Sequence, residues 1–218
     1  QNIVANASQE HVSNEKMIMM MIDSAFVLKL YNSFQDERYL YFLVELVHGG
    51  ELFTLLRDKG SIPDKSARFY AAGVVEAFKH MHALCITYRD LKPENLLITR
   101  GGYIKLIDLG LAKVVTERTL TLCGTPEYIA PEVISGGTHS FEVDVWSLGV
   151  ILYRMATNKF PFDAANLAQL ALKITAGSFP PLSPNYSPQA HHLVALLLQI
   201  VPEPREPNPN PNPNPNPN

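Results

Sequence analysis

The segment YRDLKPENLL, residues 88–97, brings together side chains with complementary chemistry. Asp90 offers a carboxylate, Lys92 an ammonium group and Asn95 an amide oxygen, and Asp108 in the downstream IDLG adds a second carboxylate. Transfer of a phosphoryl group from a nucleotide needs a carboxylate to orient the acceptor hydroxyl, a cation near the moving phosphate and oxygen ligands for Mg²⁺. These residues predict that chemistry. Asp90 would orient the hydroxyl, Lys92 would neutralise the γ-phosphate, and Asn95 and Asp108 would bind the metal.

The hydrophobic pattern upstream of this segment predicts one helix and a β-hairpin. Residues 13–22 carry apolar side chains at helical spacing, which predicts a helix with one buried face. The apolar residues of that face are Met17, Ile18, Met21 and Ile22. Residues 26–34 and 39–47 are strand-like runs, and the polar QDER between them predicts a hairpin connection.

The pattern around and beyond the segment is mostly helical. Residues 50–60 predict a short helix that Gly60 stops, and residues 63–84 predict a long amphipathic helix. Residues 143–156 are apolar on nearly all sides, which is typical of a helix in the middle of a domain. The expected core contacts of the long helix are Phe69, Val74, Val75, Phe78 and Met81. From Pro202 the sequence changes to alternating Pro and Asn, which predicts an extended, disordered tail without an assigned function.

Composition excludes several classes of protein. The net charge of −3 argues against a general nucleic-acid binder or an anionic-membrane binder, because both need a basic face. No apolar run approaches the ~20 residues of a membrane span. Cys85 and Cys123 make no disulfide framework, which favours an intracellular, cytoplasmic location. The first residue is Gln, so we expect a fragment or a processed product.

Four motifs together resemble the protein kinase family. YRDLKPEN looks like the catalytic loop, IDLG like the magnesium-binding motif, APE at residues 130–132 like the end of the activation segment, and DVWSLG like the central helix. In that helix Asp144 would brace the catalytic loop, and Arg205 matches the basic residue that pairs with Glu132. The resemblance covers about residues 10–205.

The resemblance implies an α+β, protein-kinase-like fold. Its C-lobe would be mostly helical, and its N-lobe would be partial, with one helix and part of the β-sheet. The corresponding division is residues 1–45 for the partial N-lobe, 46–206 for the C-lobe and 207–218 for the disordered Asn-Pro tail.

Within the family, Tyr88, GGELF at Gly49 and TLCGTPEY at Thr121 look like the AGC branch regulated by cyclic nucleotides. GELFTLLRDKG followed by RFYAAGVVEAF is similar to the cGMP-dependent kinases. This implies a serine/threonine protein kinase that uses ATP and Mg²⁺ on protein substrates with basic residues before the Ser or Thr. It also leaves room for an upstream cyclic-nucleotide-binding regulatory region outside these 218 residues.

The resemblance also implies site residues beyond the four named first. Thr125 would hydrogen-bond Lys92 and Asp90 as part of the catalytic group. The nucleotide site would comprise Glu15, Val44, Glu45, Val47, Glu51, Leu97 and Asp108. Substrate contacts would come from Glu51, Glu94, Leu122, Pro126 and Ile129. The activation-loop phosphate would be carried by Thr121 and bound by Arg89, Lys113 and His11.

Some of these residues have simpler interpretations, and some positions depart from the family. Glu51 and Glu94 could be solvated surface carboxylates, and Thr121 an unmodified loop threonine. Leu109 stands where the family usually has Phe, in an apolar stack with Met19, Leu30 and Tyr88. Arg154 stands where the family often has a glutamate that reads a substrate arginine, so we expect weaker reading of that arginine.

The family's glycine-rich loop and strand lysine would precede Glu15. Within the 218 residues the first glycine is Gly49, and no Lys or Arg precedes Lys16. If each missing contact costs about 3 kcal/mol of transition-state stabilisation, the 218 residues alone would retain little activity. Three interpretations follow: part of an active kinase, a kinase-like binding or scaffolding protein that is catalytically dead, or the product of a damaged gene. Magnesium-dependent nucleotide binding distinguishes the first from the second.

Overall fold

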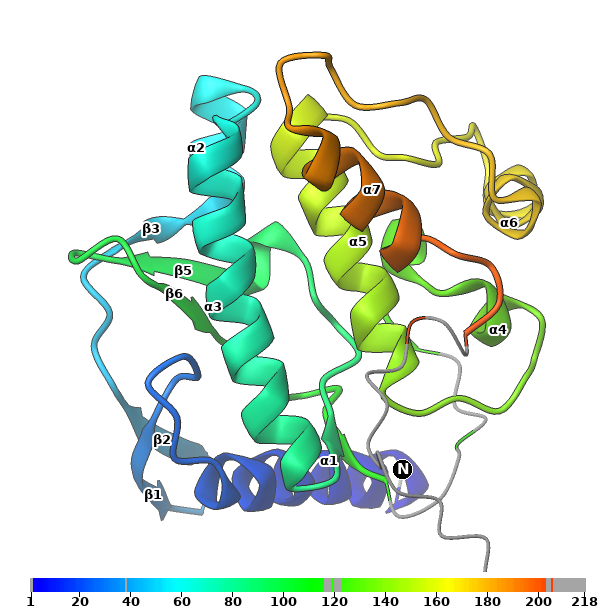
Figure 1. The fold of residues 1–218 in the computed structure, drawn as a ribbon. Coiled ribbons are helices and arrows are strands. Elements are labelled where there is room, and N and C mark those ends of the chain that lie inside the picture. The colour runs from blue at the N-terminus through cyan, green and yellow to red at the C-terminus, as the bar shows by residue number, and fades with distance from the viewer. Residues whose placement is uncertain (1, 38, 116–118, 120–122, 203–204, 206–218) are drawn as a thin grey trace, which may run out of the picture.

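The computed structural model describes residues 2–37, 39–115, 119, 123–202 and 205, with side chains from residue 12 onward. It has the expected mixed α+β architecture, with short antiparallel sheets beside a larger set of helices (Figure 1). The elements are α1 (Asn2–Met21), β1 (Leu30–Gln35), β2 (Leu40–Val44), β3 (Gly49–Glu51), α2 (Leu52–Lys59), α3 (Asp64–Ala83), β4 (Ile86–Thr87), η1 (Pro93–Asn95), β5 (Leu96–Thr99), β6 (Ile104–Leu106), β7 (Lys113–Val114), η2 (Pro126–Tyr128), α4 (Pro131–Ile134), α5 (Glu142–Thr157), α6 (Leu167–Ala176) and α7 (Pro188–Leu197).

The hairpin predicted from the two strand-like runs is confirmed, with shorter strands. β1 and β2 pair antiparallel, with Ser33 opposite Phe42. The turn between them is closed by Asp36, whose backbone N–H donates to the Tyr39 carbonyl at 3.0 Å and whose carboxylate accepts from the Tyr39 N–H at 2.8 Å. A polar turn residue that satisfies the backbone in this way explains why QDER ends one strand and begins the next.

The first helix differs from its prediction in length and in its buried face. The predicted helix covered residues 13–22, whereas α1 covers Asn2–Met21. Ile18 and Ile22 are buried as expected, but Met17 and Met21 are 47% and 42% exposed, and Met19 is buried instead. The buried stripe is therefore rotated by part of a turn. Several apolar residues in a row fit more than one stripe, so spacing alone could not choose between them.

The long helix α3 begins and ends within a residue of its prediction, and Val74, Phe78 and Met81 are buried in the core. Phe69 and Val75 were predicted as core contacts, and this was wrong: their exposed fractions are 47% and 40%. The Phe69 ring lies instead against Tyr103, with centroids 5.4 Å apart, at the outer edge of the helix. An aromatic residue can thus find a partner at the surface without entering the core.

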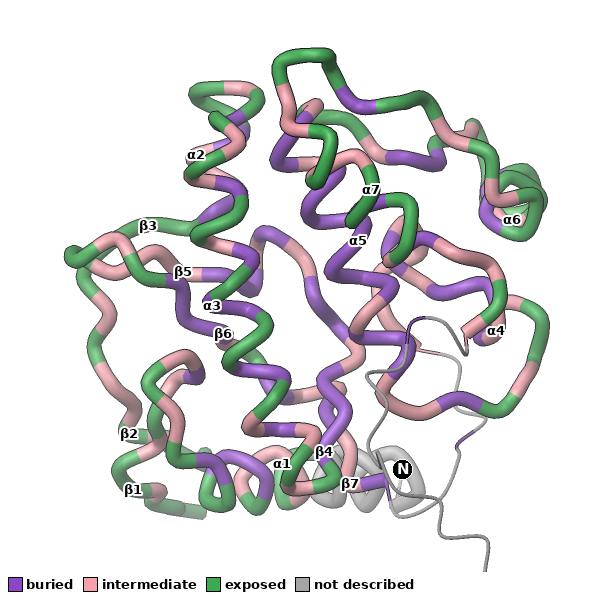
Figure 2. The backbone as a smooth tube through the Cα atoms, viewed as in Figure 1, coloured by how far each residue is buried: buried purple, intermediate pink, exposed green. Residues whose placement is uncertain are grey.

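The centre of the molecule is α5, which lies between α3 and α7 (Figure 1). Thirteen of its sixteen residues are buried, and the helix is purple along nearly its whole length in Figure 2. Gly149 permits this packing, because a Cβ atom there would lie 2.8 Å from the Leu197 Cβ atom. The prediction of a central buried helix is confirmed.

The N-terminal elements are joined to the helical part by the segment that follows α1. The Leu28 N–H donates to the Leu106 carbonyl, and the Leu106 N–H donates to the Phe26 carbonyl, each at 2.8 Å. Lys105 of β6 adds an ion pair to Glu45 at 2.8 Å. These contacts hold the segment after α1 and the end of the hairpin against β6, which directly precedes Asp108. Among the described residues, no helix is long and apolar enough to cross a membrane.

Candidate active site

The segment that carries Asp90 is held by a buried carboxylate from α5. Asp144 is fully buried and accepts hydrogen bonds from the backbone N–H groups of Tyr88 at 2.9 Å and Arg89 at 2.8 Å. His82 Nε2 lies 2.8 Å from the same carboxylate. Arg89 has φ 69°, a left-handed conformation that is unfavourable for a residue with a side chain. Asp144 braces this strained turn, as the resemblance implied.

Asp90 is the centre of a hydrogen-bonded cluster. Its carboxylate accepts from Lys92 Nζ at 2.7 Å, from Asn95 Nδ2 at 2.9 Å and from the Thr125 hydroxyl at 3.2 Å. Lys92 Nζ also donates to the Thr125 hydroxyl oxygen at 3.3 Å. The structure therefore brings together Asp90, Lys92, Asn95 and Thr125, the four residues that were predicted as the catalytic group. Three donors fix the carboxylate in one orientation, while Lys92 keeps a positive charge beside it.

Asp108 lies next to this cluster through the backbone. The N–H of Ile107, the residue before Asp108, donates to the backbone carbonyl of Asn95 at 3.0 Å. Asn95 is the other residue that was predicted to bind the metal. Asp108 is exposed and has φ 61°, and one of its carboxylate oxygens accepts from the Gly110 N–H at 3.0 Å. Within the described residues, no three His, Cys, Asp or Glu side chains form a metal-binding group. Asp108 and the Asn95 amide remain the two oxygen donors that the sequence predicts for Mg²⁺.

Glu15 of α1 faces the same region. Burial first, and then the negative charge of Asp108, raise the pKa of the Glu15 carboxyl above its ordinary value. The structure thus brings Glu15 within electrostatic range of Asp108. Leu109 and Met19 are buried nearby, and the buried Tyr88 donates its hydroxyl to the Ile107 carbonyl.

The residues predicted to contact the nucleotide lie at the junction between β2 and the helical part. Val44 ends β2, and the Glu45 N–H donates to the Lys29 carbonyl at 2.9 Å. Further along, Glu51 pairs with Leu97 in the β3–β5 register, which brings these two predicted residues together. Gly49 is needed for that pairing, since a Cβ atom there would lie 1.5 Å from the Ile98 carbonyl oxygen.

Much of the predicted phosphate-binding group lies outside the described residues. This applies to Thr121 and to the side chain of His11, and Leu122, which was predicted to contact the substrate, also lies outside the described residues. Of its proposed partners, Arg89 donates from Nε to the Leu111 carbonyl at 2.8 Å, and Lys113 Nζ donates to the Thr119 hydroxyl oxygen at 3.1 Å. The Arg89 Nη1 atom is buried without an acceptor among the described residues, so it retains capacity to bind an anion.

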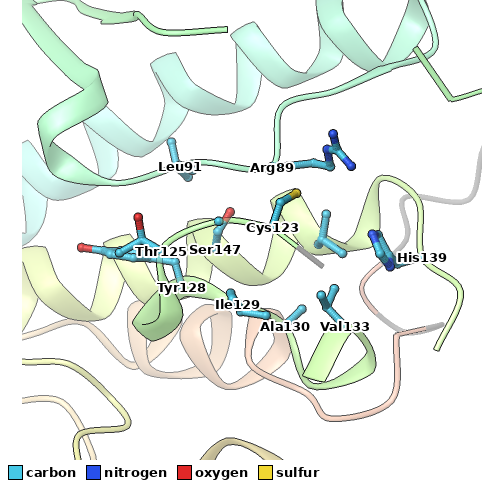
Figure 3. Close-up of a pocket in the computed structure, with 12 residues that line it drawn as sticks. Arg89, Leu91, Cys123, Thr125, Tyr128, Ile129, Ala130, Val133, His139 and Ser147 are labelled. Carbon is cyan, nitrogen blue, oxygen red and sulfur yellow. The ribbon is translucent and has the colours of Figure 1, made fainter. Parts of the chain in front are cut away.

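A cavity of about 20 Å³ lies beside Arg89 (Figure 3). Arg89 and Leu91 line one side, and the segment 123–130 lines the other, with Cys123 and Thr125 among its labelled side chains. Its volume suits about one water molecule, so it is far too small for a nucleotide. Burial raises the pKa of the Cys123 thiol despite the nearby Arg89 charge, which keeps the thiol protonated and poorly reactive.

Of the predicted substrate-contacting residues that the structure describes, two lie at η2 and two lie in other elements. Pro126 and Ile129 are half-buried at this turn, Glu94 is half-buried in η1, and Glu51 is exposed at the end of β3. Tyr128 was not predicted as a site residue, and its hydroxyl accepts a hydrogen bond from Arg154 Nη1 at 2.9 Å. Tyr128 closes the TLCGTPEY motif, but no spacing rule links it to Arg154, because the two residues lie 26 positions apart.

Comparison with known proteins agrees with this geometry. The family model described as protein kinase domain matches residues 2–207, and the chain belongs to the protein kinase family. Human cGMP-dependent protein kinase 2 is 48% identical over 167 residues, which is 76% of this chain and 22% of that protein. Drosophila melanogaster cGMP-dependent protein kinase, isozyme 2 forms cD5/T2, is 49% identical over 166 residues, or 75% of this chain and 18% of that protein. The human cAMP-dependent protein kinase catalytic subunit PRKX is 43% identical over 176 residues, covering 81% of this chain and 49% of that protein. The chain thus spans about a fifth of the length of the cGMP-dependent kinases that it matches.

Proposed function

We propose that this chain is part of the catalytic domain of a serine/threonine protein kinase, which transfers the γ-phosphate of ATP to Ser or Thr residues of protein substrates. The observation that carries the proposal is the Asp90 cluster, in which one carboxylate contacts Lys92, Asn95 and Thr125. That cluster supplies a hydroxyl-orienting group and a fixed positive charge at one point. Phosphoryl transfer depends mainly on positioning and charge stabilisation of this kind.

In this mechanism the acceptor hydroxyl binds at the Asp90 carboxylate. Asp90 orients that hydroxyl and accepts its proton, and Lys92 offsets the negative charge that develops on the transferred group. Thr125 holds both side chains in register, because its hydroxyl contacts the Asp90 carboxylate and Lys92 Nζ. Asp144 maintains the turn on which Asp90 stands.

The residues around Asp108 fit Mg²⁺ and the nucleotide. Asn95 uses its amide nitrogen on Asp90, and Asp108 is an exposed carboxylate, so hard oxygen atoms of the type that Mg²⁺ prefers are available. Bound Mg²⁺ would neutralise phosphate charge. Glu15 and Glu51 would lie along the nucleotide site. Its other predicted contacts are Val44, Glu45, Val47 and Leu97.

Regulation and substrate choice extend this proposal. A phosphate on Thr121 would bind Arg89, with Lys113 and His11 as further partners, because phosphate adds nearly two negative charges and forms charge-assisted bonds with arginine. Glu51 and Glu94 would attract basic residues before the acceptor, and Pro126, Ile129 and Leu122 would contact apolar ones. The matched relatives are named as cGMP-dependent and cAMP-dependent kinases, which supports regulation by a cyclic nucleotide through an upstream region. The two free cysteines favour a cytoplasmic location.

The test is magnesium-dependent ATP binding and peptide phosphorylation by the natural full-length polypeptide, with Asp90→Asn and Asp108→Asn variants. Asp90→Asn should lower kcat about a hundredfold or more while ATP still binds. Asp108→Asn should remove the magnesium dependence of nucleotide binding. Asp163→Asn is the matched control, because Asp163 is exposed on a loop after α5 and should leave both properties unchanged. If the wild-type protein binds no nucleotide and phosphorylates no peptide, the proposal fails in favour of a binding or scaffolding role.

A further inference from the structure

We propose that Lys105 is a positioning residue for the nucleotide, because its ion pair with Glu45 fixes the junction between β2 and β3 (residues 45–48) relative to the strand that leads to Asp108. This inference rests on the proposed kinase function and gives a role to a residue outside the predicted site. Glu45 and Asp108 are predicted contacts from distant parts of the chain, and the pair holds one in place relative to the other.

Lys105 projects from a strand whose backbone is paired on both edges. On one edge of β6, Lys105 lies opposite Leu97 of β5 in the antiparallel register. On the other edge, the Leu106 N–H donates to the Phe26 carbonyl and the Leu106 carbonyl accepts from the Leu28 N–H, each at 2.8 Å. Backbone that is hydrogen-bonded on both sides opens less readily than an exposed edge. The side chain of Lys105 therefore starts from a fixed point.

The ion pair itself is largely shielded from water. Lys105 Nζ lies 2.8 Å from Glu45 Oε2, and the two side chains are 11% and 26% exposed. The same ammonium group donates to the Val27 carbonyl at 3.4 Å. Water screens such a pair weakly, and removing one partner leaves the other charge poorly solvated. The pair is thus a restraint with a defined geometry.

The junction depends on restraints of this kind. Residues 45–48 form neither a helix nor a strand. The Glu45 N–H donates to the Lys29 carbonyl at 2.9 Å, which ties the start of the junction to the hairpin side. Within the described residues β1 and β2 form a two-stranded sheet, and a hairpin of two strands is only marginally stable alone. The bond from Glu45 to Lys105 ties the junction to β6 instead, which is the better-held element.

Three predicted nucleotide contacts are linked through Lys105. Leu97 is its partner across β5 and β6, Glu45 is its ion-pair partner, and Asp108 follows β6 after one intervening residue. Residues directly opposite in an antiparallel pair place their side chains on the same face of the sheet, so Lys105 shares the face of Leu97. Lys105 acts through Glu45 and not on the transferred group. Its loss should weaken nucleotide binding and leave the chemical step intact.

The experiment compares nucleotide affinity with turnover in the natural full-length polypeptide. Lys105→Met removes the charge and keeps a side chain of similar reach. It should raise the Kd for Mg²⁺–ADP and the KM for ATP about tenfold, while kcat changes by less than about threefold, because the Asp90 cluster is untouched. Lys105→Arg keeps the charge and should stay within about threefold of the wild type in all three quantities.

Two further variants separate positioning from folding. Exchanging the charges, Lys105→Glu with Glu45→Lys, should bring the Kd closer to the wild type than either single change does. Lys105→Gln keeps a donor for Glu45 and should give an intermediate Kd, so it decides the inference if Lys105→Met does not fold. Thermal unfolding shows which variants are folded at the assay temperature.

Lys79→Met is the matched control. Lys79 forms an exposed ion pair with Glu76 on α3, with side chains 67% and 51% exposed, so the same substitution removes a lysine pair away from the junction. It should leave the Kd, KM and kcat unchanged.

The inference is overturned if folded Lys105→Met and Lys105→Gln both bind Mg²⁺–ADP within about twofold of the wild type, since the pair would then serve stability alone. It is equally overturned if breaking the pair tightens nucleotide binding, or if kcat falls about tenfold while the Kd is unchanged. A wild-type protein that binds no Mg²⁺–ADP and phosphorylates no peptide would refute the proposed function, and the inference with it. That result is visible in the wild type alone, so the two failures are distinguishable.

Discussion

Replacing Asp144 by Asn tests how the strained turn before Asp90 is held. In the native structure the two carboxylate oxygens of Asp144 accept from different N–H groups, Oδ2 from Tyr88 and Oδ1 from Arg89. Asn has a similar shape but only one acceptor oxygen, and its amide nitrogen would face one of these donors. One buried N–H group therefore loses its partner, and the negative charge that strengthens both bonds is removed.

The magnitude follows from these losses. A hydrogen bond to a charged group contributes about 1.5–3 kcal/mol, and an unsatisfied buried donor costs about 1–3 kcal/mol. These terms overlap, because both describe the same donor, so we expect the free energy of unfolding to fall by about 2–3 kcal/mol. A domain with a total stability of about 5–15 kcal/mol would still fold, and its weakest point would be the turn at Arg89.

Two measurements check this expectation. Urea unfolding gives the change in free energy, and native-state hydrogen exchange should show faster exchange of the Tyr88 and Arg89 amides than of amides in α3. Asp23→Asn is the matched control, because Asp23 forms an exposed ion pair with Lys29, and the loss of a solvent-screened pair should change the free energy of unfolding far less than Asp144→Asn. A change below about 0.5 kcal/mol for Asp144→Asn, with both amides still protected, would refute the bracing role of Asp144.

Three other changes have expected outcomes. Arg205→Met leaves the Glu132 carboxylate buried without its 2.7 Å partner and should lower the free energy of unfolding by about 3–5 kcal/mol in chemical denaturation. Gly149→Ala inserts a Cβ atom where α7 approaches α5, and overpacking should cost about 1–3 kcal/mol by the same measurement. Glu15→Gln should raise Tm at pH 7, because the raised pKa of Glu15 makes its charged form unfavourable in the folded state. That difference should disappear below the ordinary carboxyl value of 4.5, where Glu15 is protonated in both states.

Each of these expectations has a control and a contrary result. Replacing Arg205 and Glu132 together by Met and Gln should be milder than Arg205→Met alone, and equal losses would contradict the buried-charge explanation. Ala at Gly50, where no atom lies within 4 Å of the added Cβ, should be far milder than Ala at Gly149. For Glu15→Gln, a Tm difference that does not change between pH 4 and pH 7 would show that the effect is not electrostatic.

The sequence predicted best the elements in which apolar residues recur at helical spacing over several turns. In α3 and α5, apolar residues recur over several turns, so the helix type and the bounds are accurate to one or two residues. The spacing of apolar residues did not predict the bounds of α1 or the exposure of the Phe69 side chain. The buried face of a helix near the surface depends on what packs against it, and that information lies in distant parts of the chain.

The site shows the same division between local and distant information. Asp90, Lys92 and Asn95 lie within one short segment, so their types and spacing could be interpreted together from the sequence. The contacts that make the segment work come from far away, since Thr125 is 35 residues and Asp144 is 54 residues beyond Asp90 in the numbering. For Thr125 and Asp144 only the family resemblance, and not the spacing of residues, indicated a role.

The sequence pattern did not predict the backbone conformation of the residues around the site. Arg89 and Asp108 both have positive φ angles, although neither is glycine, and such conformations are unfavourable unless the surroundings hold them. The Asp144 carboxylate accepts a hydrogen bond from the Arg89 N–H and so holds the conformation of Arg89. At Asp108, the side-chain carboxylate accepts from the Gly110 N–H. The residues proposed to orient the acceptor and to bind Mg²⁺ therefore lie on or directly beside strained turns. Asp144, which holds the first of these turns, belongs to the buried helix α5, so we expect a change in the core around α5 to alter the chemistry of the site before it unfolds the domain.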